Sequence, residues 1–211
     1  MLLYKDIQEF IKTIDLSDID NKRITLLKEL ASYIDNEQNI FTNLIFICTH
    51  NSRRSILAQV WAQTFASYFN LKEINCYSGG TEATEVYAKI VETLSETGFK
   101  TKIISKEKNP VSLIKYSDNM PPIVVFSKKY NHLFNPQNAF CAIMTCSDAD
   151  SNCPVVVGAK NRISLTYEDP KIFDATDLKT KKYYERNLQI AKEMYFVFSQ
   201  ISSIRIKKAK K

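Results

Sequence analysis

A cysteine and an arginine six positions apart, Cys48 and Arg54, are the residues of this chain whose types and spacing best suit covalent chemistry. A guanidinium can bind two oxygens of a tetrahedral anion at once, and the N–H groups of a loop that opens a helix attract anions. Such surroundings lower the pKa of a cysteine thiol from about 8.5 to roughly 3.5–7.5. We therefore predict that Cys48 is a thiolate nucleophile and that Arg54 binds the oxyanion.

The segments on either side of this loop predict a strand that leads into a helix. Residues 44–47 are an apolar run typical of a buried strand, and apolar residues repeat at helical spacing over 53–69. A strand, a tight loop and a helix are the context that a phosphate-type loop needs. Without that context, a small buried cysteine would be an equally good interpretation of Cys48.

Four stretches of the chain, in this order, resemble the low-molecular-weight phosphotyrosine phosphatase superfamily, which also contains thioredoxin-coupled arsenate reductases. They are residues 48–55 (Cys-x5-Arg-Ser), 77–82, 146–154 and 167–170. The resemblance covers about residues 42–202. It implies a three-layer α/β fold with a central parallel four-stranded sheet in flavodoxin-like order.

The resemblance also implies roles for the loop residues. Cys48 would be the nucleophile, Ser55 would hydrogen-bond its sulfur, and Asn51 would brace the loop. Arg54 and the loop amides would hold the oxyanion. The residues expected to form the anion-binding loop are Thr49, His50, Asn51, Ser52 and Arg53.

Asp169 is implied as the general acid that protonates the leaving oxygen. Pro170 after it would stiffen the loop and leave the carboxylate one fewer neighbouring amide donor. An ordinary turn is the alternative interpretation of this Asp-Pro pair.

Two loop residues depart from the family pattern. His50 stands where the family usually has glycine, and a positive φ there would strain a histidine by about 1–3 kcal/mol. His50 would either pair with the Cys48 thiolate or lie at the surface. Arg53 stands where many relatives have a second cysteine. We expect it to be a solvated residue at the helix start or an extra cation that draws anions.

Cys146 and Cys153 match the resolving pair that arsenate reductases use. In a reductase a second thiol resolves the intermediate, whereas water does so in a phosphatase. Tyrosine phosphatases of this fold generally lack the pair, and tend to have aromatic residues where this chain has Lys171 and Ile172. The resemblance therefore favours a thiol-dependent arsenate reductase that is reset by thioredoxin or a similar thiol donor.

Two other functions remain open. One is a low-molecular-weight protein-tyrosine phosphatase that hydrolyses phosphotyrosine or small aryl phosphates through a phosphocysteine. The other is a non-enzymatic anion-binding or sensor module whose loop His50 disables.

The spacing of the cysteine pair predicts a switch segment between them. Residues seven apart on a helix are separated by about 10.5 Å along its axis, whereas a disulfide needs Cα atoms within roughly 7 Å. Residues 147–152 are small and polar, which favours turns over helix interiors. Two unpaired structural cysteines are the alternative, as we expect for Cys76 and Cys141. A zinc site is poorly supported because the chain has only two histidines. We expect no cofactor.

Composition bounds the remaining possibilities. A chain of 211 residues, 45% of them hydrophobic, is enough for one full core with some additions. No apolar run is long enough to span a membrane and no secretory pattern opens the chain, so we expect a cytoplasmic protein without a membrane partner. Five cysteines, an odd number, suit reactive thiols better than a disulfide scaffold.

The net charge of +6 is mainly a property of the C-terminal tail. Five of the six charges belong to the basic residues of 205–211. Because no aromatic residues alternate with them, we expect a solvated, frayed terminus and no nucleic-acid binding.

The chain divides into an N-terminal helical extension (1–40), a catalytic domain (41–204) and the basic tail (205–211). Helical periodicity predicts a hairpin in the extension, which either packs on the domain or forms a homodimer surface. An extra strand, possible at a sheet edge, is predicted near 123–126. The domain is predicted to alternate strands at 44–48, 74–78, 140–146 and 162–166 with helices at 53–69, 84–97 and 181–203.

This alternation predicts a parallel sheet with helices on both faces. Cys48, Cys146 and Asp169 all follow predicted strands, so we expect them at one edge of the sheet.

Overall fold

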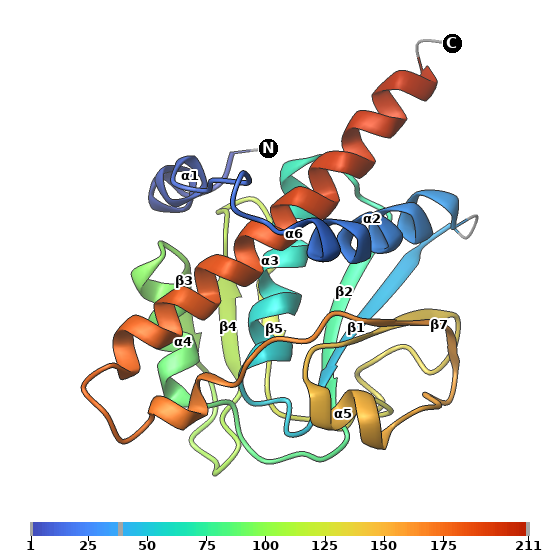
Figure 1. Ribbon diagram of the computed structural model, residues 1–211. Helices are drawn as coiled ribbons and strands as arrows, with labels where there is room; N and C mark the ends of the chain where they lie inside the picture. The colour runs from blue at the N-terminus through green and yellow to red at the C-terminus, as the bar shows by residue number, and fades with distance from the viewer. Residues whose placement is uncertain (1, 38–39, 210–211) are drawn as a thin grey trace.

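The computed structural model, which describes residues 2–37 and 40–209, is built on a four-stranded parallel sheet (Figure 1). The sheet has the order β2-β1-β6-β7, and every neighbouring pair is parallel. This is the predicted sheet and order. Its strands are β1 (Thr42–Cys48), β2 (Ile74–Gly80), β6 (Phe140–Met144) and β7 (Ala159–Ser164).

Strand β1 lies in the middle of the sheet and is buried on both faces. Leu44 and Phe46 join the large core on one face, while Ile45 and Ile47 pack into a smaller apolar cluster on the other. This alternation follows from the two-residue period of a strand, and burial on both sides explains why the sequence is apolar without interruption.

The two faces of the sheet are covered differently. Helices α3 (Arg54–Tyr68), α2 (Asn21–Asn36) and α6 (Lys179–Ala209) lie on one face, and α6 crosses in front of α3 in Figure 1. On the other face, the short α5 (Ser147–Asn152) packs with extended segments around Tyr130 and Val156. Helices were predicted on both faces of the sheet, but only one face is extensively covered by helices. Helix α4 (Ala88–Glu96) contacts α6 and α3.

A second, antiparallel sheet follows α4. It has the order β3-β4-β5 and contains β3 (Lys100–Ile103), β4 (Ser112–Lys115) and β5 (Ile123–Val125). The extra strand predicted near 123–126 is thus present, as an edge strand of this second sheet. The sequence did not indicate β3 and β4, because they are short and carry lysines.

The N-terminal extension packs into the main core. Phe10 of α1 (Lys5–Lys12) stacks on Trp61 of α3 with ring centroids 5.1 Å apart. Helix α2 begins after Asp20, whose carboxylate accepts from Arg23 N–H, and buries Leu27 among other residues along α6. In Figure 1 α1 is seen end-on and α2 lengthwise. The two helices predicted for the extension are therefore both present.

The C-terminal segment is helical where it is described. Helix α6 continues to Ala209, so the expectation of a frayed tail from residue 205 is wrong up to that point; residues 210 and 211 lie outside the described chain. Arg205 pairs with Asp35 and Glu73, and Lys208 pairs with Asp35. These ion pairs and the continuing backbone hydrogen bonds hold the segment against α2. Within residues 2–37 and 40–209, no helix combines the length and apolar character needed to cross a bilayer.

Lys128 is a buried cation beneath the loop that follows Cys48. Its side chain is 1% exposed, and its ammonium lies over the rings of Phe126 and Phe134, 4.6 and 5.4 Å from their centroids. Burial lowers the pKa of Lys128 to about 8. Its backbone N–H donates to Asn51 Oδ1 at 3.0 Å, which connects this buried residue to the loop.

We predict that Lys128→Met stabilises the protein at neutral pH and less so at alkaline pH. Below about pH 8 the amine is charged in both folded and unfolded chains, so folding buries a charge; above about 10.5 neither state carries it. The free energy of unfolding should rise by up to about 3 kcal/mol at pH 7, and this gain should shrink by about 2 kcal/mol at pH 9.5.

Urea denaturation at both pH values measures this effect, with Lys129→Met as the matched exposed control. A gain that is equal at the two pH values would contradict the assignment of the effect to the buried amine.

Candidate active site

The loop between β1 and α3 forms one wall of a cavity of about 180 Å³. The cavity brings together Cys48 at the end of β1, Arg54 at the start of α3 and Asp169 from the segment after β7. The carboxyl ends of parallel strands meet at one edge of a sheet, and this edge holds the three residues. The lining residues are Cys48, Thr49, His50, Ser52, Arg53, Arg54, Asp148, Asp169 and Lys171.

A chain of hydrogen bonds ends at the Cys48 sulfur. Cys48 Sγ lies 3.1 Å from Ser55 Oγ, and Asn51 Nδ2 donates to that same oxygen at 2.9 Å. Because Ser55 Oγ accepts from Asn51, its own hydrogen is available for the sulfur. Ser55 and Asn51 are both fully buried, so water does not compete for these bonds. The arrangement lets Ser55 donate a hydrogen bond to the Cys48 sulfur.

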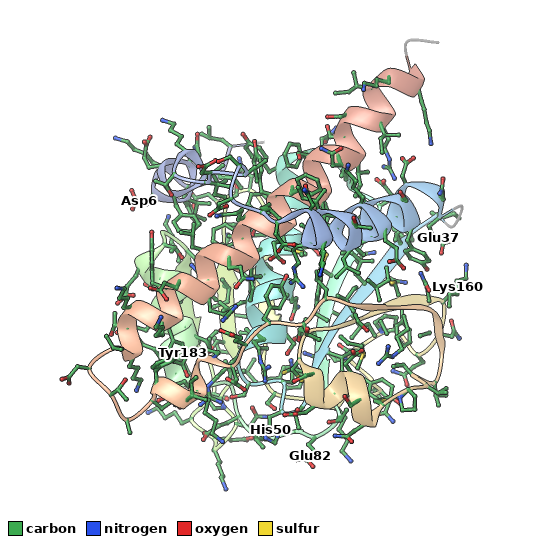
Figure 2. All side chains as sticks on the ribbon, viewed as in Figure 1. Asp6, Glu37, His50, Glu82, Lys160 and Tyr183 are labelled. Atoms are coloured by element: carbon green, nitrogen blue, oxygen red, sulfur yellow. The ribbon has the colours of Figure 1, made fainter. Side chains whose placement is uncertain are left out.

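Asn51, and not His50, adopts the left-handed backbone conformation in this loop. The φ of Asn51 is 47°, a region that asparagine tolerates better than most residues, and His50 does not have a positive φ. The strain considered for His50 is therefore not present. His50 Nδ1 lies 3.4 Å from Glu82 Oε2, and Figure 2 shows the two residues near each other at the lower edge of the molecule. The imidazole nitrogen thus faces Glu82 and not the Cys48 sulfur.

Arg54 is held by two protein oxygens at the cavity. Its Nη1 donates to the Tyr167 carbonyl at 2.9 Å, and its Nη2 donates to Asp169 Oδ2 at 2.5 Å. Its Nε has no hydrogen-bond partner among the described residues. An incoming anion can replace Asp169 at Nη2, while the Tyr167 carbonyl keeps the guanidinium in place.

Arg53 has a different environment from its neighbour. Its Nε donates to Tyr183 Oη at 2.7 Å, its Nη2 donates to Asp174 Oδ2 at 2.8 Å, and its guanidinium lies 4.1 Å from the Tyr87 ring centroid. Burial raises the pKa of Tyr183, whose hydroxyl in turn donates to Asp174. The expectation of a solvated Arg53 is wrong. Its charge is largely balanced by Asp174, so it mainly ties the loop to α6.

Asp169 precedes a short 3-10 turn, η1 (Pro170–Phe173). Its Oδ1 accepts from Lys171 N–H at 3.0 Å, and its Oδ2 is paired with Arg54. Pro170 removes one amide donor as expected, but the next N–H in the chain takes over that contact. The carboxylate is thereby directed toward Cys48's cavity.

Cys146 lies beside the loop that follows Cys48. Its sulfur is fully buried, 3.4 Å from Thr49 Oγ1, and accepts from Ala149 N–H at 3.3 Å as the N-cap of α5. Cys153 follows the last residue of α5 and is partly exposed. The segment between them forms a six-residue helix, although its small polar residues predicted turns.

The five cysteines are all free thiols. Cys76 and Cys141 are buried in strands away from the cavity, and burial raises the pKa of both, that of Cys141 to about 12. These properties agree with a structural role for Cys76 and Cys141.

Lys171, which stands where tyrosine phosphatases tend to have an aromatic residue, lines the cavity and is exposed at its rim. Sequence reasoning did not assign Asp148 to the cavity; its position two residues after Cys146 was the available signal. Within the described residues, no group of three or more His, Cys, Asp and Glu side chains is arranged to hold a metal ion.

Comparison with known proteins agrees with this geometry. Residues 43–119 match the family model of low molecular weight phosphotyrosine protein phosphatases. The chain is 27% identical to arsenate reductase 2 of Staphylococcus epidermidis over 127 residues, which are 60% of this chain and 77% of that protein. It is 24% identical to arsenate reductase 2 of Staphylococcus saprophyticus over 151 residues, covering 67% of this chain and 95% of that protein.

Solved structures share the fold at lower identity. An arsenate reductase in its phosphate-binding state superimposes with a TM-score of 0.50 at 17% identity, over 76% of this chain and 99% of that one. A low molecular weight protein tyrosine phosphatase from Bacillus subtilis gives 0.53 at 15% identity, over 78% and 99%. The sheet order and the Cys48–Arg54 loop agree with the match of residues 43–119 to the low molecular weight phosphotyrosine protein phosphatase family, and the chain shares the fold of these solved structures.

Proposed function

We propose that this protein is a thiol-dependent arsenate reductase. The observation that carries the proposal is the position of Cys146, whose buried sulfur lies 3.4 Å from Thr49 and in the same apolar cluster as Cys48. A second thiol next to the nucleophile supplies the group that resolves a covalent intermediate without water. The names of the relatives support the same assignment.

The first step forms a covalent adduct at Cys48. Arsenate binds to Arg54 and the loop amides, and the Cys48 thiolate attacks arsenic. An S–As bond forms as one As–O bond breaks. Asp169, released from Arg54 as the anion binds, supplies in its acid form the proton with which that oxygen leaves as water.

The next two steps transfer the electrons. The Cys146 thiolate attacks the Cys48 sulfur, an S–S bond forms, and the S–As bond breaks with its electron pair left on arsenic as arsenite. The Cys153 thiolate then attacks Cys146, which forms the second disulfide and returns Cys48 as thiolate. Thioredoxin or a similar dithiol reduces the Cys146–Cys153 disulfide, a role that suits the partly exposed Cys153.

The rim of the cavity suits an inorganic oxyanion better than an aryl phosphate. Asp148 and Lys171 flank its opening, and no Phe, Tyr or Trp of the described residues lines it. A phenol ring would therefore lack apolar walls. Hydrolysis of phosphotyrosine or small aryl phosphates remains the alternative reaction for the same nucleophile and arginine.

We predict that Cys146→Ala abolishes arsenite production with a thioredoxin system but leaves hydrolysis of p-nitrophenyl phosphate unchanged. The variant keeps Cys48 and Arg54 yet lacks the resolving thiol. Arsenite formation should fall at least 100-fold, the size of loss expected when a required nucleophile is removed. Cys141→Ala, another fully buried cysteine in the same strand region, is the matched control and should keep both activities. Strong hydrolysis with no arsenite from the unmodified protein would assign the chain to the phosphatases.

We further predict that Asp169→Asn lowers kcat by roughly 10²–10⁴-fold, because the amide cannot supply the proton. KM for arsenate should stay the same or fall, since Arg54 no longer has a carboxylate to release. Asp174→Asn is the control, because Asp174 also accepts from an arginine but does not line the cavity. Steady-state kinetics on both variants test this; equal losses of kcat would show that Asp169 is only structural.

A further inference from the structure

Helix α5 depends on contacts at its two ends. A helix of six residues is too short to be stable by itself, and its Ser, Asp and Asn residues are weak helix formers. At its start, Ala149 N–H donates to the Cys146 sulfur. Its other end leaves backbone carbonyls without partners inside the helix, as every helix does.

Arg162 of β7 fills that second end. Its Nη2 donates to the Asp150 carbonyl at 2.5 Å and to Asp150 Oδ1 at 2.6 Å, and its Nε donates to the Cys153 carbonyl at 3.2 Å. Ser164 completes the network, because it accepts from Arg162 Nη1 and donates to Asp150 Oδ1. A cation that binds the last carbonyls of a helix stabilises it.

These contacts are shielded and therefore effective. The side chains of Arg162 and Asp150 are 26% and 28% exposed, so solvent and salt screen the pair less than a surface ion pair. The guanidinium contacts a carbonyl on each side of Asn152, and unwinding of α5 separates both carbonyls from it. The contacts to the Asp150 and Cys153 carbonyls thus exist only while the segment is closed.

In the relay proposed above, Cys153 reaches Cys146 only when α5 opens. The sulfur of Cys146 leaves its place as N-cap when it bonds to Cys48, so the hold at the first end is lost at that step. The contacts of Arg162 at the C-terminal end of α5 then remain to stabilise the closed segment.

We propose that Arg162 is a positioning residue that keeps the switch segment, residues 146–153, closed in the reduced protein and thereby sets how often Cys153 meets Cys146. The effect of Arg162 on turnover rests on the proposed function, whereas its effect on the closed conformation of residues 146–153 does not. Because Arg162 stabilises the reduced, closed form, it also makes the Cys146–Cys153 disulfide easier to reduce.

The test measures opening in the fully reduced protein without arsenate. Cys146 is fully buried, so iodoacetamide reaches it only when the segment opens, and mass spectrometry of its peptide reads the rate. Arg162→Met should raise the alkylation rate of Cys146 about tenfold or more, the effect of losing charge-assisted hydrogen bonds. Arg162→Lys, which keeps the charge but not the planar fork, should lie between the two.

Two internal controls separate local opening from unfolding. Cys141 is equally buried but lies in β6, so its alkylation rate should not change. Lys160→Met removes an ion pair with Glu37 from the same strand without contact to the switch segment and should leave Cys146 protected. An unchanged Cys146 rate in both Arg162 variants, or an equal increase at Cys141, overturns the proposal.

The redox potential gives a second readout that a purely structural role would not move. The Cys146–Cys153 couple of Arg162→Met, equilibrated with a dithiol of known potential, should become about 30 mV more negative for each tenfold gain in opening. Increased opening in a protein that forms no arsenite would refute the proposed function and keep the role of Arg162. Arsenite formation together with unchanged opening and an unchanged potential in the Arg162 variant would support the proposed function and refute the role of Arg162.

Discussion

The hydrogen bonds that run from Lys128 N–H through Asn51 and Ser55 to the Cys48 sulfur are the interaction on which the site depends. They give the sulfur a fixed donor and hold the loop in a conformation that needs a left-handed residue at Asn51. Neighbouring strand ends support the loop from the side, since Thr81 N–H donates to the Cys48 carbonyl and Glu82 N–H to that of Thr49. The Cys48 sulfur is thus positioned by a buried network of hydrogen bonds, which is a preorganised arrangement.

The parallel sheet brings the second thiol to this loop. β1 and β6 run in register from Asn43 and Phe140 to Ile47 and Met144, and Thr145 N–H then continues the pairing by donating to Ile47. The next residue, Cys146, therefore lies beside Thr49 although 97 positions separate them in the chain. Cys146 contacts Thr49 of the loop that follows Cys48, and it also caps the short helix α5, which Arg162 contacts at its other end. The contacts of Cys146 thus connect the Cys48–Arg54 loop with residues 146–153.

The N-terminal extension supports the same site from behind. Arg23 of α2 lies 4.7 Å from the ring centroid of Tyr167, and the Tyr167 carbonyl accepts from Arg54. Arg23 is also paired with the buried Glu193 of α6 at 2.7 Å. Tyr167 thus connects α2 with the Arg54 guanidinium at the cavity. The extension is therefore part of the framework of the cavity as well as of the core.

Local patterns in the sequence determined the four sheet strands, the main helices, the Cys48–Arg54 loop and the sheet edge on which Cys146 and Asp169 lie. These features follow from periodicity and from the direction of parallel strands, which short segments encode by themselves. Only the tertiary structure decided that Arg53 is engaged by Asp174 and Tyr183, which lie more than 100 positions away in the chain. It also decided that residues 147–152 form a helix, because Arg162 stabilises that helix from another strand. Side-chain partners that are distant in sequence leave no local pattern, so their choice appears only when the chain is folded.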